Sequence, residues 1–112
     1  MTKRSHKLYI KDILDAIDKI EGYAKGLSFE RFSGNELVID AIIRNFEIIG
    51  EASKHMPNPI RSEYKDVPWK EMAGMRDKVI HEYFGVDLDI VWKTVKERLP
   101  DLKRQLLHIH SE

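Results

Sequence analysis

The sequence contains no cysteine, and this absence removes several kinds of chemistry at once. Disulfide bonds, a thiolate nucleophile and a thiolate metal site are all excluded. A reducing compartment is permitted, and we expect a cytoplasmic protein. Only four prolines and six glycines interrupt the 112 residues, a composition that favours helices.

A long apolar run and a net charge are also missing. No stretch of about 18 apolar residues occurs, so we expect no membrane span. The basic first seven residues lead into an acid-bearing amphipathic segment, not into the apolar core of a signal peptide. The 19 basic and 19 acidic residues cancel, so neither DNA nor RNA is expected to be held by overall charge. Binding of RNA would need a local pocket.

The residues that are present show helical periodicity. Residues 5–25 carry an apolar stripe and precede Gly26, which suits a left-handed helix end. Asn35 is placed to cap a second helix that reaches about His55. This second helix is apolar around most of its circumference, with a narrow polar stripe: Asp40, Arg44, Glu47, Glu51 and Lys54. Such a helix must be covered on more than one side, within a bundle or at an oligomer interface.

Two further helices are predicted in the second half of the chain. Pro68 opens one that Gly85 closes, and Asp87 caps another that runs towards the C-terminus, with Pro100 kinking or restarting it. No segment has the alternation of a β-strand. The sequence therefore predicts one all-α domain over residues 1–112, a bundle of four to five helices.

The predicted helix over residues 68–85 carries the candidate chemistry. Arg76, His81 and Tyr83 have the spacing R-x4-H-x-Y. On an ideal helix Arg76 and Tyr83 lie roughly 20° apart on the apolar face, so Arg76 needs a partner, either a carboxylate such as Glu47 or Glu51 or a bound phosphate.

His81 lies about 140° away from Arg76 on the same ideal helix, on a face shared with Asp77 and Gly74. Asp77 is four residues before His81 and can orient its imidazole, and the missing side chain of Gly74 would allow close approach. One helix does not bring the two faces together. We therefore expect the site between two chains.

Each of these residues also has an ordinary structural interpretation. A histidine near a helix C-terminus interacts with the dipole, and an inward arginine is often a salt-bridge partner. R-x4-H is short, and chance matches are common. Glu51 and His55 could share one helical face as metal ligands do, but no third ligand is evident, so neither a metal nor a cofactor is expected.

A chain-wide resemblance bears on this choice. Residues 40–52, 67–69 and 75–85 resemble the HepT-like branch of the HEPN superfamily, and residues 15–17, 91–92 and 99–102 extend the resemblance. The resemblance implies a homodimeric HEPN bundle with the motif helices at its interface. It also implies the toxin component of a type VII-like HEPN–MNT toxin–antitoxin module.

The family's residue roles can be carried over to this sequence. The resemblance implies a metal-independent endoribonuclease in which Arg76 holds the scissile phosphate and His81 acts as general acid or base, supported by Asp77. Its product would be a 2′,3′-cyclic phosphate. Tyr83 would accept AMP from a partner MNT-type nucleotidyltransferase antitoxin, and the nucleotide would block the phosphate site.

Three residues of the second helix are expected to line the cleft: Arg44, Glu47 and Glu51. Two other interpretations stay open. In one, the chain is a non-catalytic nucleotide-binding or adaptor subunit of a nucleotidyltransferase complex, which the zero net charge favours slightly. In the other, it is a dimeric scaffold in which Arg76 serves only structure.

Overall fold

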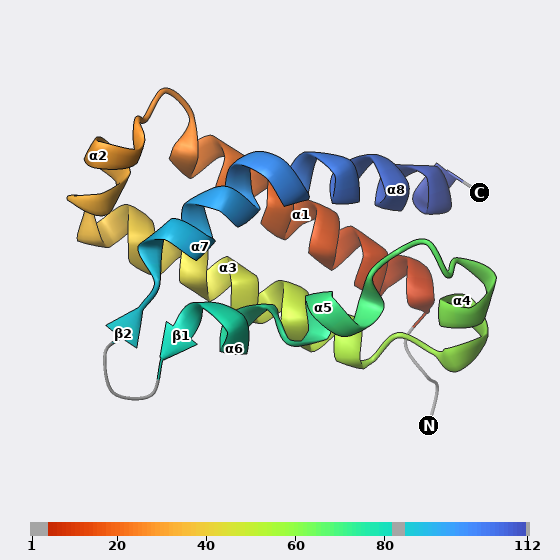
Figure 1. Ribbon diagram of the computed structural model, residues 1–112. Helices are drawn as coiled ribbons and strands as arrows, with labels where there is room; N and C mark the ends of the chain where they lie inside the picture. Colours follow the sequence, from red (N-terminus) through yellow and green to blue (C-terminus); the bar gives the residue numbers. More distant parts are fainter. Residues whose placement is uncertain (1–4, 82–84, 112) are drawn as a thin grey trace.

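The protein is described by a computed structural model that covers residues 5–81 and 85–111, with side chains described for residues 5–77 and 87–111 (Figure 1). The helices are α1 (His6–Ala24), α2 (Phe29–Ser33), α3 (Glu36–Lys54), α4 (Asn58–Glu63), α5 (Trp69–Ala73), α6 (Met75–Val79), α7 (Leu88–Lys93) and α8 (Leu99–Ser111), with a π turn, η1 (Thr94–Arg98), between the last two. Two short strands, β1 (Ile80–His81) and β2 (Gly85–Val86), pair antiparallel. The predicted helical bundle is confirmed.

The ends of the two long helices follow local sequence signals. The Ser5 hydroxyl accepts a hydrogen bond from the Lys7 backbone N–H at the start of α1, and Gly26 follows its end with a φ of 76°. At the start of α3 the Asn35 side chain accepts from the Val38 N–H at 3.1 Å. These contacts satisfy backbone groups that a helix end leaves open, so both predicted boundaries are confirmed.

The helix α3 lies at the centre of the bundle. It packs against α1 on one side and against α5 and α6 on the other, while α8 covers α1 (Figure 1). The expectation that α3 is covered on more than one side is confirmed. The core between these helices contains the fully buried side chains Ile10, Ile13, Ile17, Ile20, Phe32, Ile42, Phe46, Ile49, Met72, Leu99 and Leu106. Within the described part of the chain, no helix combines the length and the apolar character that crossing a bilayer requires.

An ion-pair cluster joins α1 to α8. The Lys103 ammonium lies 2.9 Å from Asp18 Oδ1 and 2.8 Å from Glu21 Oε1. These two carboxylates raise the pKa of Lys103 well above its usual range. The cluster fixes the outer helix to the first one.

The last helical segment contains a π turn just before Pro100. The Leu99 N–H donates to the Thr94 carbonyl, five residues back, in place of the usual four. Proline has no N–H and its ring collides with the carbonyl four residues earlier in a regular helix. The wider turn supplies the room that Pro100 needs, so the chain continues as α8. The π turn at Thr94–Arg98 is therefore the feature behind the predicted kink or restart at Pro100.

A close backbone approach positions the second half of the chain against α3. A Cβ built on Gly50 would lie 3.1 Å from the Ala73 carbonyl oxygen and 3.5 Å from that of Met72. Only glycine leaves this space, so α5 can lie directly on α3. Among the described residues, a Cβ on Gly74 would meet the Lys70 carbonyl at an ordinary 3.7 Å, so close approach at Gly74 stays a prediction.

The predicted single helix over residues 68–85 is wrong. It is interrupted at Gly74, which has φ −96° and ψ 11° and separates α5 from α6. Helix α6 ends at Val79, and the chain turns into the β1–β2 pair, with Ile80 opposite Val86 and His81 opposite Gly85. Glycine is a poor helix residue, and the β-branched pair Val79-Ile80 suits extended backbone. The strands are two residues each, too short to produce an alternating pattern.

Candidate active site

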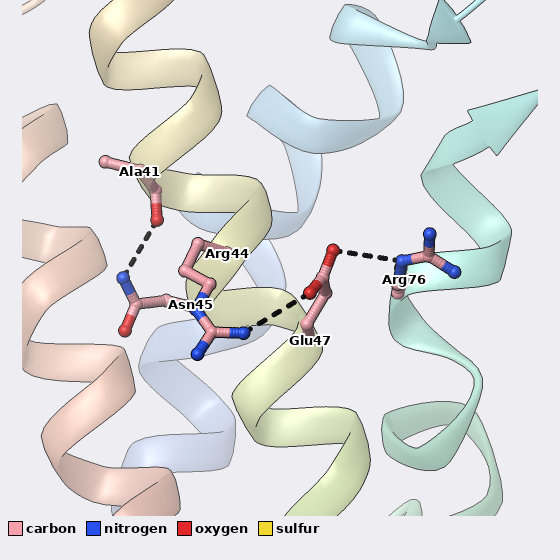
Figure 2. Close-up of polar contacts among 5 residues, drawn as sticks. All are labelled: Ala41, Arg44, Asn45, Glu47 and Arg76. Carbon is pink, nitrogen blue, oxygen red and sulfur yellow. Dashed lines mark hydrogen bonds and ion pairs between the residues drawn. The ribbon is translucent and has the colours of Figure 1, made fainter.

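Arg76 lies in the first turn of α6, facing α3. Its Nε donates to Glu47 Oε1 at 3.1 Å, across 29 positions of sequence. The other carboxylate oxygen of Glu47 lies 3.5 Å from the Arg44 NH1 nitrogen, one turn earlier on α3. Figure 2 shows the two guanidinium groups reaching Glu47 from two sides. The predicted structural partner of Arg76 is therefore found, and it is Glu47.

The contact with Glu47 leaves half of the Arg76 side chain exposed. The Arg76 side chain is 50% exposed, and its NH1 lies 3.7 Å from Asp77 Oδ1, beyond hydrogen-bond distance. Within the described residues, the bond from Nε to Glu47 is the one hydrogen bond of this guanidinium. Glu47 thus fixes the base of the guanidinium fork. No described residue hydrogen-bonds the terminal nitrogens of Arg76, and these nitrogens suit an anion.

A groove of about 250 Å³ runs beside Arg76, between α3 and the α5–α6 segment. Its lining consists of Glu47, Gly50, Glu51, Lys54, Ala73, Arg76 and Asp77. Three acidic and two basic side chains therefore meet on a backbone brought close by Gly50. Of the predicted cleft-lining residues, Glu47 and Glu51 lie in this groove, and Arg44 lies beyond Glu47.

His81 lies in strand β1, two residues after the end of α6. It is not on the helix of Arg76, so the predicted separation of about 140° does not apply. The predicted spacing of Asp77 and His81 on one helical face is wrong for the same reason, and Asp77 instead lies near Arg76. The side chain of His81 is outside the described residues, and so is the whole of Tyr83.

A second groove, of about 470 Å³, lies between α1 and α3 on the other side of Glu47. Tyr9 from α1 stacks on His55, with ring centroids 5.8 Å apart and an angle of 17° between the planes. Arg44 also lines this groove, together with the carboxylates of Asp12, Glu47 and Glu51. Sequence reasoning missed Tyr9, because a contact between two helices leaves no mark in the periodicity of either one.

Two other polar features of α3 lie apart from Arg76. The Glu51 and His55 side chains come within 3.8 Å, as expected for one helical face. Across the residues whose side chains are described, no three histidine or acidic groups gather as metal ligands would. Asn45 is buried and donates to the Ala41 carbonyl of its own helix at 2.8 Å (Figure 2).

Gly50 is the other residue that sequence reasoning overlooked. It lies within the apolar helix α3, where a glycine destabilises the helix by about 1 kcal/mol relative to alanine. A glycine at such a position indicates a close backbone approach or a functional constraint. The signal was present in the sequence, although it did not identify Ala73 as the neighbour.

Comparison with known proteins shows the family of this chain. The profile described as "Ribonuclease HepT-like" matches residues 13–109. The chain is 52% identical over 101 residues to a Thermococcus cleftensis protein named "Probable ribonuclease HepT", covering 90% of this chain and 92% of that one.

Two further relatives come from different organisms. A candidate RNase of Methanocaldococcus jannaschii is 45% identical over 94% of this chain and 87% of its own length. A candidate RNase of Caldanaerobacter subterraneus is 45% identical, with 90% of each chain covered. No solved structure gives a significant match. The family profile and the relatives span the helices that carry Arg76 and Glu47, and the chain belongs to the HepT-like ribonuclease family.

Proposed function

We propose that this protein is a metal-independent endoribonuclease that cuts RNA with Arg76 and His81. The observation that carries the proposal is the Arg76 guanidinium, anchored at 3.1 Å by Glu47 with its terminal nitrogens available beside a groove. A planar fork of this kind suits a phosphodiester. The names of the relatives support RNA as the substrate.

The proposed reaction is attack from within the RNA strand. His81 takes the proton from a ribose 2′-hydroxyl as general base, or gives a proton to the leaving 5′-oxygen as general acid. The 2′-oxygen bonds to phosphorus as the bond to the 5′-oxygen breaks. The products are a 2′,3′-cyclic phosphate and a 5′-hydroxyl end. Arg76 stabilises the charge that develops on the phosphate oxygens, and Asp77 supports the position of Arg76.

We further propose that the active form is a homodimer with its two motif segments at a shared cleft. Arg76 is half exposed, as a residue facing a second subunit or a substrate would be before binding. In this arrangement the two copies of the R-x4-H motif would face one RNA strand. The proposed setting is the cytoplasm.

The proposal includes regulation by a partner. A minimal nucleotidyltransferase encoded with this protein would transfer AMP to Tyr83, two residues after His81, and so act as the antitoxin. The bulky anionic nucleotide would then compete with RNA for Arg76. The experiment is intact mass measurement after co-expression: gains in steps of AMP are expected, and none in Tyr83→Phe.

Cleavage of single-stranded RNA by the purified, unmodified protein tests the enzyme proposal. RNA should be cut in the presence of EDTA, and the new ends should carry a 2′,3′-cyclic phosphate. The His81→Ala variant should leave RNA intact while keeping its helical circular dichroism. Intact RNA with the wild-type protein would contradict the proposal and favour the non-catalytic adaptor, which would still bind the nucleotidyltransferase.

A further inference from the structure

We infer that the groove between α1 and α3 binds the nucleotide next to the cleaved phosphate, with Arg44 on its phosphate and the Tyr9–His55 pair on its base. The inference rests on the proposed function, because it extends the path of the RNA from Arg76. Three observations carry it: the two arginines that share Glu47, the stacked aromatic pair, and the lining common to both grooves.

The shared carboxylate sets the spacing of the two cations. Arg76 contacts Glu47 Oε1 at 3.1 Å, and Arg44 lies 3.5 Å from Oε2 of the same group. Only one carboxylate group and these two contacts separate the guanidinium groups (Figure 2). In the inferred complex, each guanidinium group binds one of two phosphates of the same strand. The Arg44 side chain is 71% exposed, so its terminal nitrogens are accessible to one of them.

The aromatic pair offers a stacking surface in the same groove as Arg44. Tyr9 and His55 lie nearly parallel, and both line the groove that Arg44 also lines. An open groove of about 470 Å³ has room for a nucleobase beside them. Base stacking on such side chains contributes on the order of 1–3 kcal/mol per base and does not depend strongly on sequence.

The grooves are neighbours, not separate sites. Glu47 and Glu51 line both of them, so α3 forms the ridge over which a strand would pass. The negative charge of Glu47 is balanced by Arg44 and Arg76. Glu51 is placed to accept hydrogen bonds from the amino or imino edge of a base. A protein without net charge can hold RNA in this way, through local cations and stacking.

The experiment measures binding of two probes to the His81→Ala protein, which is expected not to cut them. One probe is a labelled ten-nucleotide oligo(A), and the other is a ribose-phosphate chain of the same length without bases. Adding Tyr9→Leu should weaken oligo(A) binding about tenfold and leave the abasic chain unaffected. Adding Arg44→Gln should weaken both probes and lower the salt dependence of log affinity by about 0.7.

Matched controls separate these effects from general damage. Tyr23→Leu changes the other tyrosine of α1, which is exposed, and Arg31→Gln changes an exposed arginine of α2. Neither residue lines the groove. Both should leave the two affinities unchanged. Equal weakening of both probes by Tyr9→Leu, or oligo(A) binding that is insensitive to Tyr9→Leu and Arg44→Gln, would overturn the inference.

The inference and the proposed function can fail separately. If wild-type protein does not cut RNA but the two substitutions change the affinities for the two probes as expected, the enzyme proposal fails and the groove assignment holds. If wild-type protein cuts RNA and the substitutions change neither binding nor cleavage, the groove assignment fails alone.

Discussion

Lys103 and Arg76 each join two helices by contacting a carboxylate, and they use their hydrogen-bond donors differently. Lys103 contacts two carboxylates of α1 at 2.8 and 2.9 Å. Arg76 makes one bond to Glu47, through Nε, and shares that carboxylate with Arg44. Lys103 therefore contacts two carboxylates, whereas Arg76 and Arg44 both contact the single carboxylate of Glu47.

The difference separates a structural ion pair from a site that is prepared for a ligand. Two of the three N–H donors of Lys103 face carboxylates, so at most one donor is left for a ligand. Arg76 has five donors, and among the described residues only Nε makes a hydrogen bond. An anion could bind the remaining fork without breaking the contact that orients it. We expect substitutions at the first position to affect stability and those at the second to affect activity.

The largest effect is expected from Arg76→Ala. Loss of the proposed phosphate contact should lower kcat/KM for RNA cleavage by a factor on the order of 10² to 10³. The side chain is half exposed, so the free energy of unfolding should fall by less than about 1 kcal/mol. Cleavage assays and urea unfolding provide the two measurements, with Arg31→Ala as control. A loss of stability without a loss of activity would show that Arg76 has a structural role only.

Glu47→Gln should have the next largest effect. An amide keeps the size of the side chain but removes the charge that holds Arg76 and Arg44 together. Small misplacements of a phosphate-binding group reduce rates steeply, so kcat should fall on the order of tenfold to a hundredfold. Glu63→Gln changes an exposed glutamate of α4 and should have no effect. Unchanged cleavage by Glu47→Gln would contradict the positioning role.

Gly50→Ala tests the packing on which both arginine contacts depend. The added methyl group would lie 3.1 Å from the Ala73 carbonyl and push α5 away from α3. The expected cost is about 1–2 kcal/mol of unfolding free energy, with reduced cleavage because α6 follows α5. Gly22→Ala in α1 has nothing within 4 Å and should instead stabilise the protein by about 0.5–1 kcal/mol. Similar stabilisation by both substitutions would show that α5 can shift without strain.

Lys103→Met is expected to have the smallest effect, on stability alone. Partly exposed ion pairs contribute about 0.5–1 kcal/mol, and the cleavage rate should not change. The pKa of Lys103 is raised in the folded state by Asp18 and Glu21. Its contribution should be complete below the ordinary lysine pKa of 10.5 and should be lost as the pH rises through the folded pKa. Urea unfolding should show a constant wild-type advantage up to about pH 10.5 and a decreasing one as the pH rises further.

Much of the fold could be predicted because its signals are local. Ser5, Asn35 and Asp87 cap their helices through side-chain bonds to nearby N–H groups, and such contacts are encoded within four residues. The polar stripe of α3 follows from helical spacing in the same way. Glu47 could be named as a partner of Arg76 because an inward charge requires one.

The interruption of the motif helix could not be predicted in the same way. A glycine inside a helical pattern is usually tolerated, so Gly74 did not predict a helix end. The end of α6 at Val79 depends on the pairing of the following strand with residues 85–86. The close contact of Gly50 with Ala73 joins two segments that are distant in sequence. Such contacts arise from the packing of whole helices and are not visible in a short window.

The π turn before Pro100 has a consequence for how this helix can change by insertion and deletion. Its hydrogen bond from Leu99 to Thr94 encloses one residue more than a regular turn does. Removing one residue between 94 and 98 would restore regular spacing, but the proline ring would then meet the carbonyl four residues before it. Such a deletion should be accepted only together with replacement of Pro100, so the length of this segment and the identity of that residue are expected to vary together among homologues.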